Sequence, residues 1–171
     1  MQRRTQTAET PTFGWPAKAT PHVYFDPPEM ALKWAPDDDA EKPWYFLGDH
    51  RYQNTVFQYD VASGTRTDLA SVPRIARLWC NPNGRWQRAA AFHDAAYSIQ
   101  DCDRFDADAM FRAIMHRDGC GALRAFWMYA AVRVFGGYAW QRNARRLAAK
   151  LDLDRQLAML RRRSIDYGEA T

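Results

Sequence analysis

A histidine and an aspartate stand side by side at His93 and Asp94, one helical turn before Tyr97, and a second aspartate follows at Asp108. Histidine is the side chain that gains and loses a proton most readily near neutral pH. One carboxylate can orient its ring, and another can bind a hard cation. This group is the only one in the sequence whose residue types and spacing suit catalysis.

Helical periodicity predicts how these side chains meet. Apolar residues recur at helical spacing over residues 85–100, which predicts a helix. His93 and Tyr97 then lie on one face, and Asp94 is rotated by about 100° from His93. A second helix is predicted over residues 104–116. If this helix returns antiparallel to the first, its aspartate comes within reach of the imidazole.

This arrangement predicts metal-assisted hydrolysis of an ester. Asp108 would hold one ring nitrogen of His93 and leave the other free to take a proton from water. Tyr97 would donate its hydroxyl to Asp108. Asp94, directed elsewhere, would bind a cation that polarises the carbonyl, and Ca²⁺ suits oxygen ligands better than Zn²⁺ does. Asp68 is either a further ligand of the cation or a turn residue.

A purely structural interpretation of the same residues stays open. His93 and Asp108 would then form a buried polar pair that fixes the register of two helices. Asp94 would cap a helix or form a salt bridge with Arg74 or Arg104. Ion-pair networks of this kind imitate catalytic sites.

Composition and charge bound the scaffold. The 171 residues are 47% hydrophobic and include 7 Trp, 9 Phe and 8 Tyr, enough for one domain with a core. Three cysteines without a paired spacing favour a reducing compartment. The net charge of +4 is too small to predict a nucleic-acid partner. We expect a flexible arm at 1–20, a globular domain at 21–140 and a basic amphipathic helical tail at 141–171.

Aromatic and β-branched runs predict strands before the helices. They occupy residues 22–26, 43–48 and 55–60, and each is bounded by Pro, Gly or Asp. The acidic segment 29–43 between them predicts a loop. The expected fold class is therefore α+β, with a small antiparallel sheet packed on a three-helix layer.

The third helix of that layer is predicted over residues 122–135. It is apolar nearly all round, which predicts a central buried helix, and Gly136-Gly137 is expected to end it. Arg124 and Arg133 need partners in such a helix. The expected partners are three aspartates, Asp68, Asp94 and Asp106, and phosphate binding is the alternative.

The tail beyond this helix is basic. Eight basic and two acidic residues lie between Trp140 and Ser164, a net charge of +6. The apolar pattern changes phase at Asp152-Leu153-Asp154, which predicts a break between two helices. Such a tail suits nucleic acid, an anionic membrane surface or an acidic protein, or it is simply a solvated helix face.

Several motifs together resemble a small uncharacterised family of tailed-phage and prophage proteins. They are the segments 67–74 (TDLASVPR), 91–97 (AFHDAAY) and 107–111 (ADAMF), then 129–136 (YAAVRVFG). The resemblance covers residues 45–140. It implies a phage origin and no defined activity.

A shorter stretch resembles the catalytic helices of secreted and parvoviral phospholipases A2. His93-Asp94-Ala-Ala-Tyr97, with Asp108 and Phe111, carries this likeness. It implies that His93 is the base, Asp94 the calcium ligand and Asp108 the partner of the histidine. Those enzymes have a glycine-rich calcium loop upstream, where this chain has the segment 81–84 (NPNG).

Two functions follow as expectations. The first is a phage virion or accessory component that carries a phospholipase-A2-like His-Asp site and contacts other phage structural proteins through its terminal extensions. It would be synthesised in the host cytoplasm and carried in the virion, with anionic lipid or the host envelope as a further partner. The second is a free phage-encoded lipid or ester hydrolase that uses His93 and calcium.

Overall fold

The structure is a computed structural model that describes residues 23–38, 40–69 and 86–168, with side chains described up to Leu160. The predicted arm at 1–20 lies outside these ranges. One antiparallel sheet has the order β1-β4-β5, formed by Tyr24–Asp26, His50–Gln53 and Gln58–Val61. A second has the order β2-β3-β6, formed by Leu32–Trp34, Trp44–Phe46 and Arg66–Thr67. The described helices are α2 (Gln87–Ile99), α3 (Arg104–Arg117) and α4 (Ala122–Gly168).

Alternating side chains explain the first sheet. His50 and Tyr52 in β4, and Tyr59 and Val61 in β5, point into the core, while the residues between them face outward. Tyr52 lies opposite Tyr59 in the register of the two strands. The predicted strands are present. Two sheets form instead of one, because short strands outside the predicted runs complete them.

The prediction of a loop over 29–43 is wrong for Leu32–Trp34. This segment pairs antiparallel with β3, and Lys33 lies opposite Tyr45. Trp34 packs edge-on against Trp44 with ring centroids 4.9 Å apart. Pairing with an aromatic neighbour thus orders a three-residue segment that is too short to show an alternating pattern by itself.

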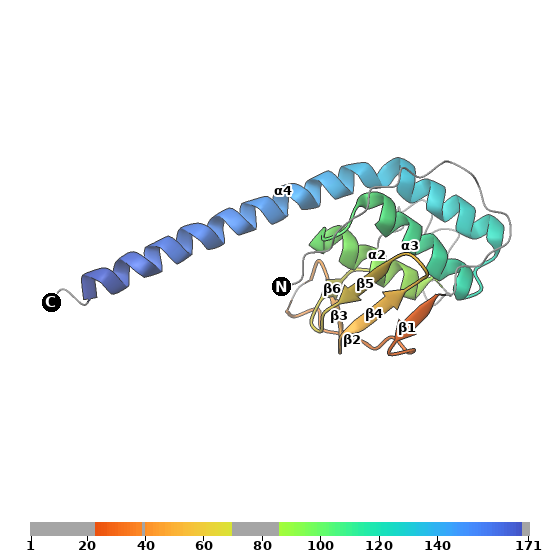
Figure 1. The fold of residues 1–171 in the computed structure, drawn as a ribbon, viewed down its shortest axis with the longest axis horizontal. Coiled ribbons are helices and arrows are strands. Elements are labelled where there is room, and N and C mark those ends of the chain that lie inside the picture. Colours follow the sequence, from red (N-terminus) through yellow and green to blue (C-terminus); the bar gives the residue numbers. More distant parts are fainter. Residues whose placement is uncertain (1–22, 39, 70–85, 169–171) are drawn as a thin grey trace.

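The helices cover one side of the strands (Figure 1), and Phe92 of α2 contacts aromatic rings of both sheets. Its ring is 5.4 Å from that of Phe25 and 6.5 Å from that of Tyr52 in the first sheet, and 5.8 Å from that of Phe46 in the second. One aromatic side chain therefore joins both sheets to the helical layer. The α+β class predicted from the sequence is confirmed.

Helices α2 and α3 lie within two residues of their predicted bounds. The α2 face toward its neighbours is built from small residues with no exposed surface: Ala89, Ala90, Ala91, Ala95 and Ala96. Small side chains let neighbouring helices approach closely. Helices α2 and α3, which carry His93, Asp94 and Asp108, therefore pack tightly against each other.

Helix α4 differs from its prediction in two ways. It is not buried all round: Ala125, Met128 and Val132 are buried, whereas Leu123, Trp127 and Val134 are 73%, 60% and 72% exposed. It also continues through Gly136-Gly137 without ending. A Cβ on Gly136 would lie 2.5 Å from the hydroxyl oxygen of Tyr97, so this glycine allows a close helix approach instead of terminating the helix.

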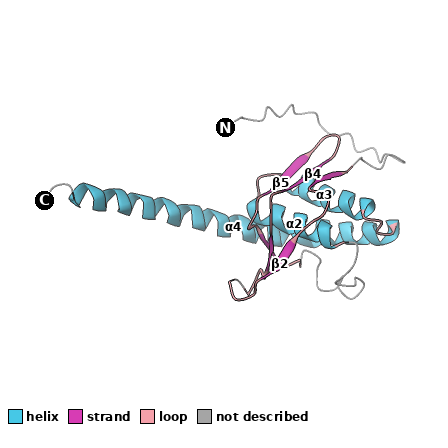
Figure 2. Cartoon of the chain, turned by 90° about the horizontal axis from the view of Figure 1, so that it is seen from below, coloured by secondary structure: helices cyan, strands magenta, loops and turns pink. Residues whose placement is uncertain are grey.

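The expected break at Asp152-Leu153-Asp154 is absent as well. Residues 151–160 are exposed on every side, so no core face requires the apolar pattern to stay in phase there. The helix projects well beyond the body of the domain (Figures 1 and 2). Among the described helices, none combines the length and the apolarity needed to cross a membrane.

Candidate functional site

The site is centred on a contact between α2 and α3. Nε2 of His93 lies 2.8 Å from Oδ1 of Asp108, and the hydroxyl of Tyr97 donates to the same oxygen at 2.8 Å. His93 and Tyr97 are one turn apart on α2, so both reach the aspartate that α3 presents. The contacts predicted from helical spacing are confirmed, and the catalytic roles of these residues stay predictions.

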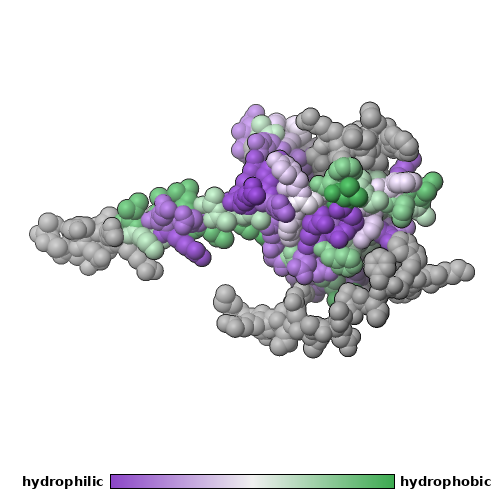
Figure 3. Space-filling view, turned by 90° about the horizontal axis from the view of Figure 1, so that it is seen from above, coloured by the Kyte–Doolittle hydropathy of each residue, from purple (hydrophilic) through white to green (hydrophobic). Residues whose placement is uncertain are grey.

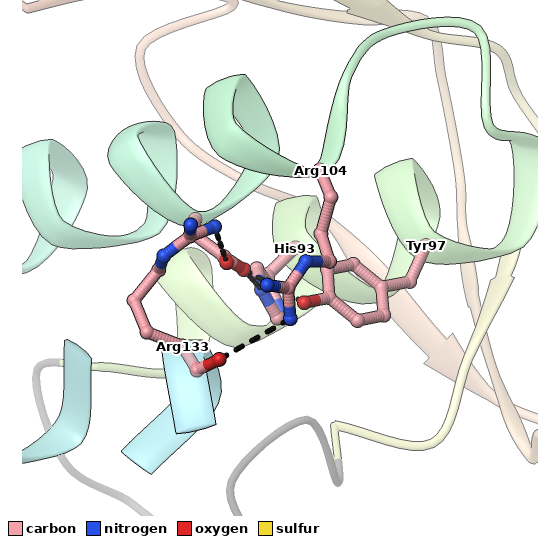
Figure 4. A network of polar contacts seen from close by, with 5 residues as sticks. His93, Tyr97, Arg104 and Arg133 are labelled. Atoms are coloured by element: carbon pink, nitrogen blue, oxygen red, sulfur yellow. Dashed lines mark hydrogen bonds and ion pairs between the residues drawn. The ribbon is translucent and has the colours of Figure 1, made fainter. Parts of the chain in front are cut away.

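A third donor comes from α4. Nη1 of Arg133 donates to Oδ2 of Asp108 at 2.8 Å, and Nη1 of Arg104 donates to the backbone oxygen of Arg133 at 3.3 Å. Figure 4 shows these side chains around the carboxylate. The expectation that Arg133 pairs with Asp68, Asp94 or Asp106 is wrong. An arginine in an apolar helix predicts that an acidic side chain pairs with it. The identity of that acid depends on how three helices pack, which the sequence pattern does not contain.

The three donors determine the charge of Asp108. Burial by itself would raise the pKa of this carboxyl, but the hydrogen bonds from His93, Arg133 and Tyr97 outweigh burial and lower it. The side chain has no exposed surface. Asp108 is therefore a buried carboxylate anion whose oxygens accept from three different side chains.

The imidazole of His93 is held in one tautomer. Because the Asp108 anion can only accept, Nε2 carries the hydrogen. Nδ1 is buried and has no hydrogen-bond partner within the described part of the chain. Burial lowers the pKa of His93, although Asp108 opposes this effect. The ring is therefore neutral at pH 7, and no described residue pairs with the acceptor at Nδ1.

This ring is closely packed. The ring of Tyr97 lies 4.2 Å and that of Phe111 5.0 Å from it, centroid to centroid, and His93 is 1% exposed. A reacting molecule can therefore reach Nδ1 only when neighbouring side chains move aside. The geometry also satisfies the structural interpretation of the pair, in which His93 and Asp108 fix helix register.

The carboxyl of Asp94 contacts the second sheet. Its Oδ2 accepts a 2.7 Å hydrogen bond from the hydroxyl of Thr67, at the end of β6, and the same hydroxyl accepts from the backbone N–H of Leu69 at 3.0 Å. Asp94 is 8% exposed. Thr67 thus connects the second sheet to α2 and holds the carboxyl of Asp94 in place.

A second carboxyl lies beside this one. Burial raises the pKa of Asp94 well above its usual value, and the charge of Asp68 and a hydrogen bond with Asp68 raise it further. Thr67 and Lys42 act in the opposite direction. The structure brings together the two residues predicted as cation ligands, one buried and one exposed. Their role as ligands stays a prediction.

The structural interpretation of the site expects Arg74 or Arg104 as the partner of Asp94. Nη1 of Arg104 donates instead to the backbone oxygen of Arg133 at 3.3 Å, and Arg74 lies outside the described residues, so a pairing of Asp94 with Arg74 stays a prediction. Within the described ranges, no cluster of three or more His, Cys, Asp or Glu side chains is arranged for a metal ion. A cation at the two carboxylates would need further oxygen ligands from water or substrate.

The comparison with known families places the chain in one of them. The model of the family described as "Protein of unknown function (DUF1353)" matches residues 44–132. That is more than half of the 171 residues, and the chain belongs to this family. The matched segment contains every predicted site residue and ends one position before Arg133. No curated protein and no solved structure matches the chain.

Proposed function

We propose that this member of the DUF1353 family hydrolyses an ester, with Nδ1 of His93 as the base that takes a proton from the attacking water. The observation that carries the proposal is the difference in hydrogen bonding between the two ring nitrogens of His93. Nε2 is committed to Asp108 at 2.8 Å, while the acceptor at Nδ1 is buried without a partner among the described residues. Catalytic bases require this combination of an oriented ring and an unoccupied lone pair.

Asp108 and its donors support that role. When His93 takes up a proton, the resulting positive charge lies next to a carboxylate that stays ionised, which stabilises the imidazolium. Tyr97 and Arg133 hold the carboxylate in place from two other directions. The two residues are positioning residues in this proposal, because both act through Asp108.

Asp94 and Asp68 are the proposed cation ligands. Burial and then the neighbouring charge of Asp68 raise the pKa of Asp94, and a divalent cation would remove the repulsion between the two carboxyls. Ca²⁺ fits such oxygen donors, and when bound it would polarise the ester carbonyl. The hydroxyl of Thr67 donates to Asp94 and so holds its carboxyl beside the end of β6.

We further propose that α2 and α3 correspond to the two catalytic helices of phospholipases A2. The support is the shared use of His, the adjacent Asp, a Tyr one turn later and an Asp on the next helix. This would make a phospholipid the substrate class. The experiment is hydrolysis of a phospholipid in mixed micelles, measured with calcium and with a chelator, for wild type and His93→Asn.

The matched control for that experiment is His116→Asn, on α3 and only partly buried. We expect His93→Asn to lower the hydrolysis rate at least about 100-fold, the usual contribution of a general base, while His116→Asn retains wild-type activity. Equal rates for wild type and His93→Asn would exclude His93 as the base. Hydrolysis that is unchanged by the chelator would exclude the calcium role of Asp94 and Asp68.

A second candidate function is favoured by the projecting part of α4. Residues 151–160 are exposed on all sides, and an isolated helix of this kind gains little stability without a partner. A virion or accessory protein that contacts other phage structural proteins would use such an extension. Mass spectrometry of purified particles tests this role, and absence of the protein from the particles would contradict it.

A further inference from the structure

The side of α4 that faces away from the core carries an unusual set of exposed side chains. Leu123, Trp127, Val134 and Tyr138 recur at helical spacing and are 73%, 60%, 72% and 76% exposed. Phe126 and Phe135 flank them. We call these six residues the aromatic face. It lies opposite Ala125, Met128 and Val132, which bury the other side of the helix.

An exposed face of this composition needs a physical explanation. Large apolar side chains scattered singly over a surface are ordinary, but a contiguous row marks a binding surface. The rings of Phe126 and Trp127 also pack edge to face, 5.4 Å apart. None of these six side chains belongs to the core of the described residues, and the proposed hydrolytic site does not use them.

The charges around the aromatic face select the kind of partner. From Gly119 to Leu151 the chain contains six basic residues and no aspartate or glutamate. Five of the basic side chains are exposed: Arg124, Arg142, Arg145, Arg146 and Lys150. A second copy of this stretch would bring no acid to meet them. Charge complementarity therefore favours an anionic partner.

The aromatic residue types favour a lipid surface over a protein. Trp and Tyr carry a polar group on an apolar ring, and they lie at the boundary between lipid chains and headgroups, where that group stays hydrated. Arginine and lysine beside them can extend to the headgroup phosphates. Because these residues lie along one outward face of a helix, they can all contact a flat lipid surface at once. Figure 3 shows apolar and polar side chains exposed together along the projecting part of the helix.

We propose that the aromatic face of α4 binds an anionic membrane surface, with the following basic segment, residues 142–150, contacting the headgroups. The helix lies along the interface in this arrangement and does not cross it. The inference does not depend on the hydrolytic site, because it rests on α4 side chains that have no part in the His93 network.

Binding to vesicles tests the proposal directly. The full chain is sedimented in calcium-free buffer with vesicles of phosphatidylcholine alone, and with vesicles that also contain phosphatidylglycerol. We expect binding to the anionic vesicles that weakens as salt is raised. Leu123→Ser/Trp127→Ser removes two apolar side chains and should reduce this binding at least about tenfold, since burial of even one such side chain changes an affinity by about that factor.

Two further variants complete the design. Val56→Ser changes an apolar side chain that is 90% exposed away from α4 and should bind like wild type. Arg142→Gln/Arg145→Gln should lower binding and flatten its salt dependence. All of these positions are exposed, so circular dichroism should be unchanged.

Several results would overturn the proposal. They are equal binding to both kinds of vesicle, no binding to either, and wild-type binding by Leu123→Ser/Trp127→Ser. A dimer in solution that this double variant dissociates would assign the aromatic face to a second copy. Vesicle binding without phospholipid hydrolysis would leave this inference intact and reject only the hydrolase, and hydrolysis of dispersed substrate without vesicle binding would do the reverse.

Discussion

Two buried aspartates of the same site are held in opposite ways. Asp108 accepts from His93, Tyr97 and Arg133, and its pKa is lowered despite its burial. Asp94 is buried beside another acid, and its pKa is raised. The first carboxylate is stabilised by the fold, and the second is costly to ionise within it. The difference teaches that the Asp108 network stabilises the folded structure. A cation bound at Asp94 would add more stability than one bound elsewhere in the site, because it would compensate a carboxylate that is costly to ionise.

The largest expected effect tests the stabilised half of the site. Asp108→Asn leaves Arg133 without its anion and introduces a buried amide beside His93. We expect it to lower the free energy of unfolding by about 3–5 kcal/mol, the usual cost of breaking a buried charged pair. Urea denaturation measures the change. The matched control, Asp60→Asn, breaks an exposed pair with Arg51 and should change the free energy of unfolding far less.

Arg133→Met should have the second-largest effect. It removes the hydrogen bond from the guanidinium to Oδ2 of Asp108, which is expected to cost about 2 kcal/mol in urea denaturation. It also leaves the Asp108 charge less compensated, so the pKa of His93 should rise. Arg124→Met, on the exposed side of the same helix, serves as the control. A His93 pKa identical to wild type would show that Arg133 has no influence on the ring.

Gly136→Ala tests how tightly α4 is packed on this network. The added Cβ would lie 2.5 Å from the hydroxyl of Tyr97, whereas at Gly137 the nearest atom, Nη1 of Arg104, is 3.4 Å away. Overpacking outweighs the helix propensity gained, so Gly136→Ala should lose about 1 kcal/mol. Gly137→Ala should be neutral or stabilising. A reversed order of the two melting temperatures would contradict this packing.

Asp94→Asn should have the smallest effect on stability and the opposite sign. It removes a carboxyl that is costly to ionise, so at pH 7 the free energy of unfolding should rise by less than about 1 kcal/mol. The raised pKa means that the wild-type protein gains stability as pH falls through that pKa, with the full gain below the ordinary value of 3.8. The variant should lack this gain in urea titrations over a pH series.

The same variant separates the two roles of the acid pair. Millimolar calcium should raise the melting temperature of the wild type, because a ligand of the native state stabilises it. Asp94→Asn should show no such increase, and Asp60→Asn should respond like the wild type. A wild-type melting temperature that calcium does not change would reject the cation site.

The sequence predicted the α2–α3 contact because helical spacing alone places His93 and Tyr97 on one face. It predicted neither Arg133 as the third donor nor the continuity of α4 through Gly136. Both depend on how closely three helices pack, which no local pattern contains. The prediction of a central buried helix is wrong for the aromatic face. Composition shows how apolar a helix is, but not whether another part of the chain covers it.

The state of the His93 ring is the most direct test of the central claim. Nitrogen-15 NMR of histidine-labelled protein distinguishes a protonated from an unprotonated ring nitrogen between pH 5 and pH 8. The structure requires a hydrogen on Nε2, none on Nδ1, and a neutral ring that persists below the ordinary pKa of 6.5, since burial lowers the pKa of His93. A hydrogen on Nδ1, or a charged ring at pH 7, would contradict the account.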